Sequence, residues 1–163
     1  MSELSHVAPQ GGVRMVDVGG KQPSARSATA RAQVRFSTAQ TLERLRAGEV
    51  AKGDVLETAR IAGIMAAKRT AELIPLCHPL VIDHAALDLE LVDDPPGVRL
   101  TATVRCRGAT GVEMEALTAA AVAALTVVDM LKSVDRWMTV EDLGLLEKDG
   151  GGHGHIVRPQ PPR

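Results

Sequence analysis

The stretch DDPPGVRLTATVRCR, residues 93–107, decides the fold. Its first five residues are two aspartates, two prolines and a glycine, a combination typical of a turn between strands. From Val98 onward, apolar residues alternate with arginine and threonine, which is the period-2 pattern of a half-buried strand. Residues 81–92 show a similar alternation in their second half. The two segments together predict a β-hairpin.

Two helical patterns flank this hairpin. Asp54 can cap a helix that ends near Leu73, before Pro75. A longer helix is expected after Gly111, with an apolar stripe that consists of Met114, Leu117, Ala121, Ala124, Leu125, Val128 and Leu131. Residues 116–128 of this helix carry no charge, but thirteen residues are too few for a membrane span of about 20. They therefore predict a buried core helix and no membrane contact.

Three weaker patterns complete the chain: a strand at 31–36, a helix at 38–47 capped by Ser37, and a last strand at 138–146. Without the helix that follows Asp54, the order is strand-helix-strand-strand-helix-strand, the ferredoxin-like arrangement. We therefore predict an α+β fold, a ferredoxin-like antiparallel sheet with helices on one face and one extra helix. The uncovered sheet face predicts an oligomer, in which a second subunit covers it.

The length and the two ends set the predicted domain organisation. A chain of 163 residues suits a single domain. Residues 1 to about 30 and the tail from Gly150 show no periodicity, so both ends are expected to be mobile. We place a flexible N-terminus at 1–13, a single domain at 14–152 and a flexible tail at 153–163.

Composition argues against several classes of protein. The formal net charge is −1, and Phe36 and Trp137 are the only aromatic residues, so the chain lacks the features of a nucleic-acid-binding protein. The first twelve residues have neither a basic start nor an apolar run, which predicts a cytoplasmic protein without a secretory signal. Cys77 and Cys106 form no CxxC pair, which disfavours a disulfide framework and a structural zinc site.

Several polar residues stand where folding alone does not require them. Lys52 lies at a helix entrance, and His78 lies between two prolines that restrict its loop. A ring held in this way suits acid–base or phosphate chemistry, although a packed structural histidine fits nearly as well. Glu113 and Glu115 open the long helix, where the helix dipole also favours acidic residues. These residues are candidates for a site, each with a structural alternative.

Asp129 and Lys132 interrupt the apolar part of the long helix near its end. At a spacing of i, i+3 they could form a simple surface ion pair, whereas a buried Asp129 would need a partner and would have a displaced pKa. Glu115 and Asp129 are fourteen residues apart on this helix, a separation of about 21 Å along its axis. If both groups serve one site, the site must combine two subunits.

Seven segments closely resemble the MoaC family, the cyclic pyranopterin monophosphate synthases of molybdenum cofactor biosynthesis. They are MVDV at 15–18, KGD at 52–54, TARIAG at 58–63, AKRT at 67–70, LIPLCHPL at 73–80, TGVEMEALT at 110–118 and AALT at 123–126, with Asp129, Met130 and Lys132 following. The resemblance covers residues 14–152. It implies a ferredoxin-like subunit that forms a homohexamer, a trimer of dimers with active sites at subunit interfaces.

The resemblance also implies an activity and roles for named residues. The reaction is the conversion of 3′,8-cyclo-7,8-dihydroguanosine 5′-triphosphate to cyclic pyranopterin monophosphate, with release of pyrophosphate. Asp129 resembles the family's acid–base residue, and Lys52 and Lys132 resemble its catalytic lysines. Residues that resemble the substrate-binding ones are Leu76, Cys77, His78, Glu113, Met114, Glu115, Lys148, Arg26 and Arg105. Ala109 stands where the family pattern has a lysine, and the tail GGGHGH departs from it as well.

The implied reaction needs cations and proton transfer. A triphosphate carries roughly four negative charges, which several Lys and Arg side chains must neutralise. Opening and rebuilding the ring requires repeated proton transfers, for which lysine and aspartate are suitable. We expect no cofactor and no metal site; Mg²⁺ is compatible with this chemistry but not required by it. The expected partners are the cyclised GTP substrate and further copies of the chain, and the enzyme would act after the radical GTP cyclase.

The same residues leave two other classes of function to consider. Ferredoxin-like domains also serve as small-molecule sensors, but a sensor does not need Lys, Asp and His to converge on a triphosphate. An RNA-binding module on the same fold is weaker still, because the expected strands lack exposed aromatic residues.

Overall fold

The computed structural model describes residues 11–152 and 154–159. This part of the chain contains five antiparallel strands and four helices. The predicted α+β class is confirmed. In chain order the elements are β1 (Ser24–Arg35), α1 (Ala39–Arg46), α2 (Val55–Lys68), α3 (Thr70–Leu73), β2 (His84–Asp93), β3 (Pro96–Gly108), α4 (Glu113–Leu131), β4 (Thr139–Asp149) and β5 (Ile156–Val157).

The sheet has the strand order β2-β3-β1-β4-β5. The predicted hairpin is confirmed as β2 and β3, which pair from Asp93 and Pro96 outward. The strand predicted at 31–36 begins earlier, at Ser24, so the expectation of irregular chain up to about residue 30 is wrong for 24–30. The buried positions Ala28, Ala30 and Ala32 alternate with Thr29 and Arg31. This alternation gives little signal in the sequence because alanine is only weakly apolar.

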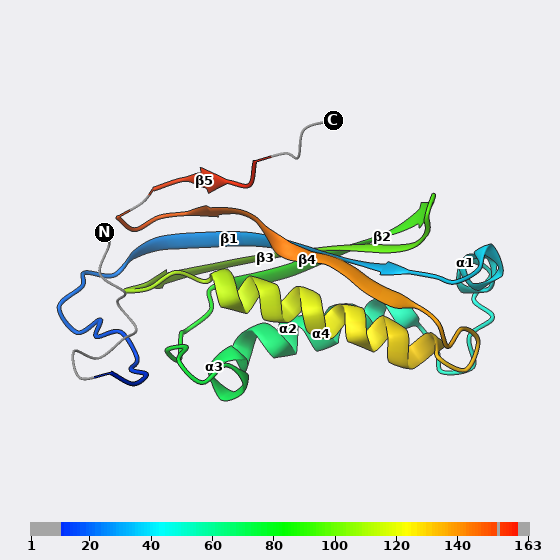
Figure 1. Ribbon diagram of the computed structural model, residues 1–163, viewed down its shortest axis with the longest axis horizontal. Coiled ribbons are helices and arrows are strands. Elements are labelled where there is room, and N and C mark those ends of the chain that lie inside the picture. The colour runs from blue at the N-terminus through cyan, green and yellow to red at the C-terminus, as the bar shows by residue number, and fades with distance from the viewer. Residues whose placement is uncertain (1–10, 153, 160–163) are drawn as a thin grey trace.

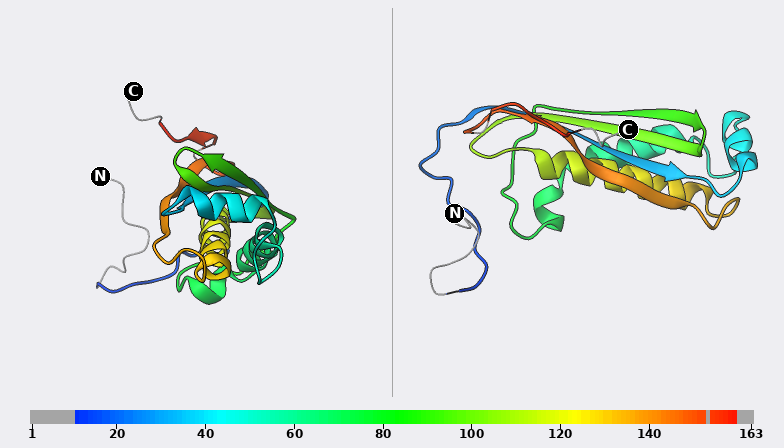
Figure 2. Two further views of the ribbon diagram at one scale, coloured as in Figure 1. Left: turned by 90° about the vertical axis from the view of Figure 1, so that its right-hand side faces the viewer. Right: turned by 45° about the horizontal axis from the view of Figure 1, so that its top comes forward.

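Helices α2 and α4 lie side by side on one face of the sheet (Figures 1 and 2). The apolar stripe predicted for α4 is confirmed for Ala124 and Leu131, which are fully buried, but wrong for Leu125, which is 60% exposed. Most of the fully buried face carries small residues: Ala116, Ala119, Ala120, Ala123, Ala124 and Val127. At Gly63 of α2, an added Cβ would lie 2.9 Å from the Ala119 carbonyl oxygen of α4. Small side chains are therefore what lets the two helices and the sheet pack closely.

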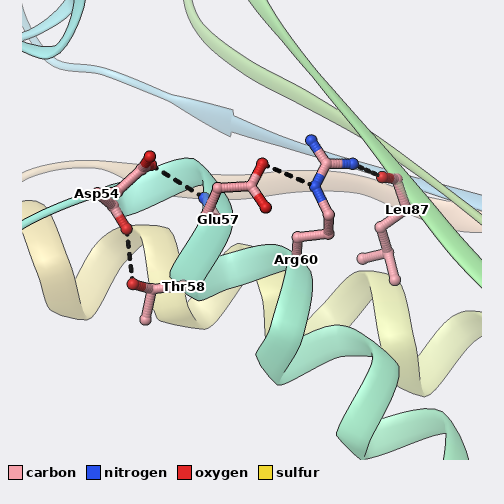
Figure 3. A network of polar contacts seen from close by, with 5 residues as sticks. All are labelled: Asp54, Glu57, Thr58, Arg60 and Leu87. Atoms are coloured by element: carbon pink, nitrogen blue, oxygen red, sulfur yellow. Dashed lines mark hydrogen bonds and ion pairs between the residues drawn. The ribbon is translucent and has the colours of Figure 1, made fainter.

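The helix predicted from Asp54 to about Leu73 is divided in two. Arg69, with φ −115°, separates α2 from the short α3. The predicted cap at Asp54 is confirmed, since its carboxylate accepts a hydrogen bond of 3.0 Å from the Glu57 amide (Figure 3). Arg60 of the same helix binds Glu57 and donates to the carbonyl of Leu87 in β2. These bonds fix the start of α2 against the sheet.

The other face of the sheet is polar and not apolar as expected; that a second subunit covers it stays a prediction. The alternate, less buried positions of β1 and β3 carry serine, threonine, glutamine and arginine, and Glu90 pairs with Arg99 across β2 and β3 at 3.2 Å. Helix α4 is long and apolar enough to cross a membrane, but 56% of its apolar window is buried. It is the core helix that the sequence predicted. Strand β5 lies within the tail at 153–163, whose flexibility stays a prediction.

The buried carboxylate of Asp135 joins two segments that lie 98 residues apart in the sequence. Ser37 does not cap α1 as predicted, because Thr38 holds that position. Instead, Ser37 donates to Asp135 from its amide at 2.7 Å and from its hydroxyl at 2.6 Å. Thr41 and the Trp137 amide donate to the same carboxylate at 3.1 and 3.0 Å. Asp135 thus joins the start of α1 to the loop between α4 and β4.

We predict that Asp135→Ala lowers the free energy of unfolding by about 2–3 kcal/mol, because it leaves several buried donors without an acceptor. Urea unfolding followed by circular dichroism measures the change. Burial alone would raise the pKa of Asp135, but the hydrogen bonds outweigh it and lower the pKa. The wild-type advantage over Asp135→Ala should therefore shrink as the pH falls below the ordinary value of 3.8. A difference under about 0.5 kcal/mol at neutral pH would contradict this role.

Candidate active site

Two lysines enclose the carboxylate of Asp129 at the C-terminal end of α4. Lys132 approaches Oδ1 at 2.7 Å, and Lys52 approaches Oδ2 at 3.0 Å. Lys52 also donates to the Asp129 carbonyl oxygen at 2.7 Å. The structure therefore brings the three predicted catalytic residues together. We call Lys52, Asp129 and Lys132 the lysine–aspartate cluster.

Local chain geometry places Lys52 in this cluster. It belongs to the loop between α1 and α2, and the next residue, Gly53, has φ +93°, a left-handed conformation that glycine adopts without strain. The Gly53 amide donates to the Val50 carbonyl at 3.1 Å, which closes the turn. Asp54 then caps α2. The turn and the cap together fix the backbone on both sides of the lysine.

The two lysines of the cluster determine the protonation state of Asp129. The carboxylate is exposed, at 57%, so the buried alternative is wrong. Hydrogen bonds from Lys132 and then Lys52 hold the pKa of Asp129 below its usual value. Asp129 is therefore ionised at neutral pH. Lys132 does form the i, i+3 ion pair, but Lys52 comes from 77 residues away, which a simple helical surface pair does not require.

A cavity of about 440 Å³ lies at the other end of α4. We call it the α4 N-terminal pocket. Its predicted members are brought together from the loop after α3 and the first turn of α4; they are Leu76, Cys77, His78, Glu113, Met114 and Glu115. Val16, Val18, Lys21, Leu80, Thr110 and Gly111 complete the lining. The predicted proline-flanked loop is thus a wall of this pocket.

Burial sets the protonation of two groups in this pocket. Glu115 is only 4% exposed, and burial, together with the nearby charge of Glu113, raises its pKa. Burial and the charge of Glu115 also raise the pKa of the Cys77 thiol. Cys77 is therefore a neutral thiol at pH 7, which suits a packing role in the wall and not nucleophilic chemistry.

The three remaining predicted residues divide between two regions. Lys148 of β4 pairs with Glu113 at 3.0 Å and so lies at the α4 N-terminal pocket. Arg105 lies elsewhere, in a separate hollow of about 690 Å³ that Arg26, His84 and Arg107 also line. Arg26 is held there by the carbonyl oxygens of residues 108 and 109, at 3.3 and 3.4 Å. The structure does not bring Arg105 to the pocket of its own chain.

Lys21 is a pocket residue that the sequence reasoning missed. It lines the α4 N-terminal pocket together with Val16 and Val18. These residues precede β1, in a segment without periodicity, so hydrophobic patterning gave no signal for them. The resemblance of MVDV at 15–18 to a family motif was the one available indication.

The lysine–aspartate cluster and the α4 N-terminal pocket lie at opposite ends of one helix. Glu115 and Asp129 are fourteen residues apart in α4, which corresponds to about 21 Å.

Cys77 and Cys106 are both free thiols. Within 11–152 and 154–159, no three His, Cys, Asp or Glu side chains gather as a metal site.

Comparisons with known proteins identify relatives of this chain. A family model described as the MoaC family matches residues 15–151. A cyclic pyranopterin monophosphate synthase of Desulfitobacterium hafniense is 53% identical over 157 residues, covering 96% of this chain and 94% of that protein. Synthases of the same name from Roseiflexus sp. and Herpetosiphon aurantiacus are each 55% identical. The first covers 96% of this chain and 99% of its own length, and the second 98% and 96%.

Glu115→Gln should stabilise the chain at neutral pH, because the buried carboxyl favours its protonated form in the folded state. The wild-type chain loses stability as the pH rises above the ordinary carboxyl value of 4.5, whereas the amide does not titrate. Urea unfolding at pH 4 and pH 8 measures both proteins. The variant should gain stability over wild type between the two pH values. An equal difference at both would contradict a raised pKa.

Proposed function

The chain belongs to the MoaC family, and we propose that it converts 3′,8-cyclo-7,8-dihydroguanosine 5′-triphosphate to cyclic pyranopterin monophosphate and pyrophosphate. It is a lyase of molybdenum cofactor biosynthesis. The observation that carries this function is the match to synthases at 53–55% identity over nearly the whole chain. The lysine–aspartate cluster supplies groups suited to the reaction at the positions that the family motifs mark.

The lysine–aspartate cluster carries out the proton transfers in this proposal. Asp129 is ionised, so it begins as a base and as the group that orients both ammonium groups. Lys52 and Lys132 begin as acids, and each lies within hydrogen-bonding distance of the carboxylate. A proton lost by a lysine to the substrate can be replaced from solvent, because the cluster is exposed. Ring opening and reclosure need such alternating acid and base steps.

The α4 N-terminal pocket binds the substrate in this proposal. Its volume and its mixed lining of Leu76, Met114 and His78 suit a planar ring with polar edges. Lys148 and Lys21 provide positive charge for phosphate groups. Arg26 and Arg105 lie together in the separate hollow. From there they would contact the triphosphate of a substrate bound by another copy of the chain. Pyrophosphate release and proton transfer leave the oxidation state unchanged, so the proposal includes no cofactor; Mg²⁺ would enter only with the phosphates.

One substrate must contact both ends of α4, so we propose an active site built from two chains. The α4 N-terminal pocket of one chain would face the lysine–aspartate cluster of another. Ile61, Met65 and Leu125 on the outer sides of α2 and α4 are 57%, 52% and 60% exposed, and such apolar residues favour an interface. The proposed assembly is a homohexamer, a trimer of dimers.

Two further proposals concern the fold family and the cell. The first four strands have the spatial order β4-β1-β3-β2 with antiparallel neighbours, which supports a ferredoxin-like subunit built on α2 and α4, with α1, α3 and β5 as additions. The extra helix is therefore α1 and not, as predicted, the helix that follows Asp54. We place the protein in the cytoplasm, where it would use the product of the radical GTP cyclase without nucleic-acid or membrane contact. The near-neutral charge and the absence of aromatic residues from the described strands support the expectation of no nucleic-acid contact.

Incubation with the cyclised GTP substrate and mass spectrometry of the products test the function directly. The wild-type protein should release cyclic pyranopterin monophosphate and pyrophosphate. Asp129→Asn should fold and bind substrate but lose at least about 100-fold in turnover, because the amide neither accepts a proton nor holds two ammonium groups. Lys52→Ala and Lys132→Ala should lose comparable activity. Asp142→Asn, an exposed aspartate paired with Arg31, is the matched control. Near-normal turnover of Asp129→Asn would remove it from the chemistry.

Light scattering after size-exclusion chromatography tests the assembly. The protein should have six times the chain mass of 17.2 kDa. Leu125→Glu should lower this mass, since it places a charge on the exposed apolar surface proposed as an interface. A fully active monomer of wild-type protein at micromolar concentration would contradict the two-chain active site.

A further inference from the structure

Glu113, in the lining of the α4 N-terminal pocket, forms an ion pair with the ammonium group of Lys148. Their charged atoms are 3.0 Å apart, and the side chains are 30% and 21% exposed. Glu113 is the first residue of α4 and Lys148 lies near the end of β4, so the pair closes the gap between helix and sheet. A lysine expected to hold substrate phosphate is therefore already neutralised by a carboxylate of its own chain.

The chain has room for this carboxylate because residue 111 is glycine. A Cβ built on Gly111 would collide with Oε2 of Glu113 and would lie 2.7 Å from its Cδ. The carboxylate thus folds back over the backbone of Gly111, in space that any larger residue would take. The backbone of Gly111 is not left-handed, so alanine can occupy the position without backbone strain. The atoms that must move are the end of a flexible side chain.

We propose that the Glu113 carboxylate is an exchangeable counter-ion of Lys148. A phosphate group displaces this carboxylate when substrate binds, and the carboxylate returns as pyrophosphate leaves. This inference rests on the proposed function, because it takes a phosphate-bearing substrate as the ligand. Glu113 is a positioning residue here, acting through Lys148.

Phosphate and the Glu113 carboxylate compete for the ammonium group of Lys148, and this competition lowers the affinity for phosphate. Phosphate carries more charge than a carboxylate and forms strong hydrogen bonds with ammonium groups, so it can replace Glu113 when other cations assist. Lys21 lines the same pocket and can assist in this way. The displaced carboxylate lowers the net affinity for substrate and product alike. Weaker retention of pyrophosphate favours product release, a step that limits turnover in many enzymes.

Isothermal titration calorimetry with inorganic pyrophosphate tests the exchange without any turnover. Glu113→Gln should bind pyrophosphate about tenfold more tightly than wild type, because Lys148 loses its competitor. Glu147→Gln is the matched control. It removes one negative charge from the residue next to Lys148 in the sequence, but the carboxylate of Glu147 contacts Thr29 and not Lys148. This control should stay within about twofold of wild type, since exposed charges are screened. Glu113→Gln combined with Lys148→Met should lose the gain.

Gly111→Ala separates displacement of the carboxylate from loss of its charge. The added methyl group takes the space of the Glu113 carboxylate while the charge stays, and pyrophosphate should again bind more tightly than in wild type. Unchanged or weaker binding in Glu113→Gln, or no pyrophosphate binding in any of these proteins, would overturn the proposal. Because the titration needs no turnover, exchange observed in a protein that does not convert the cyclised GTP would disprove the function alone. Turnover without exchange would disprove the counter-ion role alone.

Discussion

The packing of the alanine face of α4 against the sheet and α2 is the constraint on which the rest of the structure depends. Ala119, Ala120, Ala123 and Ala124 are fully buried, and Gly63 lets α2 approach the α4 backbone. Close contact along its length holds α4 as a rod across the sheet. The two ends of this rod therefore stand at a fixed separation, and each end carries charged residues that the core cannot accept.

The charged residues at each end of α4 pair with residues from a distant part of the chain. At the C-terminal end, the Gly53 turn and the Asp54 cap position Lys52 next to Asp129. At the N-terminal end, β4 positions Lys148 next to Glu113. The two groups differ in chemistry: the first is an exposed carboxylate between two lysines, and the second is a pocket with a buried, raised-pKa carboxyl. Neither alone offers both a binding pocket and an exposed acid–base cluster for a charged substrate, which supports the proposed two-chain site.

The sequence predicted those features whose signal is local. The β2–β3 hairpin follows from strict alternation and a proline-glycine turn, and the Asp54 cap follows from its place before a helical pattern. Long-range effects were missed. Ser37 resembles a helix cap, but its partner Asp135 lies 98 residues away. Hydrophobicity alone wrongly places Leu125 of α4 in the core because leucine outranks alanine, whereas close helix packing selects alanine. Lys52 and Asp129 could be joined only through resemblance to a family, since no pattern relates residues 77 positions apart.

The central claim is that one active site takes its residues from two chains, and mixed oligomers test it most directly. Asp129→Asn and His78→Ala chains, each inactive alone, are given different affinity tags, unfolded together, reassembled and purified through both tags. In a mixed pair, one interface should join the intact lysine–aspartate cluster of the His78→Ala chain to the intact pocket of the Asp129→Asn chain. Synthesis of cyclic pyranopterin monophosphate should then return to a substantial fraction of the wild-type rate. Verified mixed oligomers that remain inactive would place both residues in one chain and contradict the two-chain site.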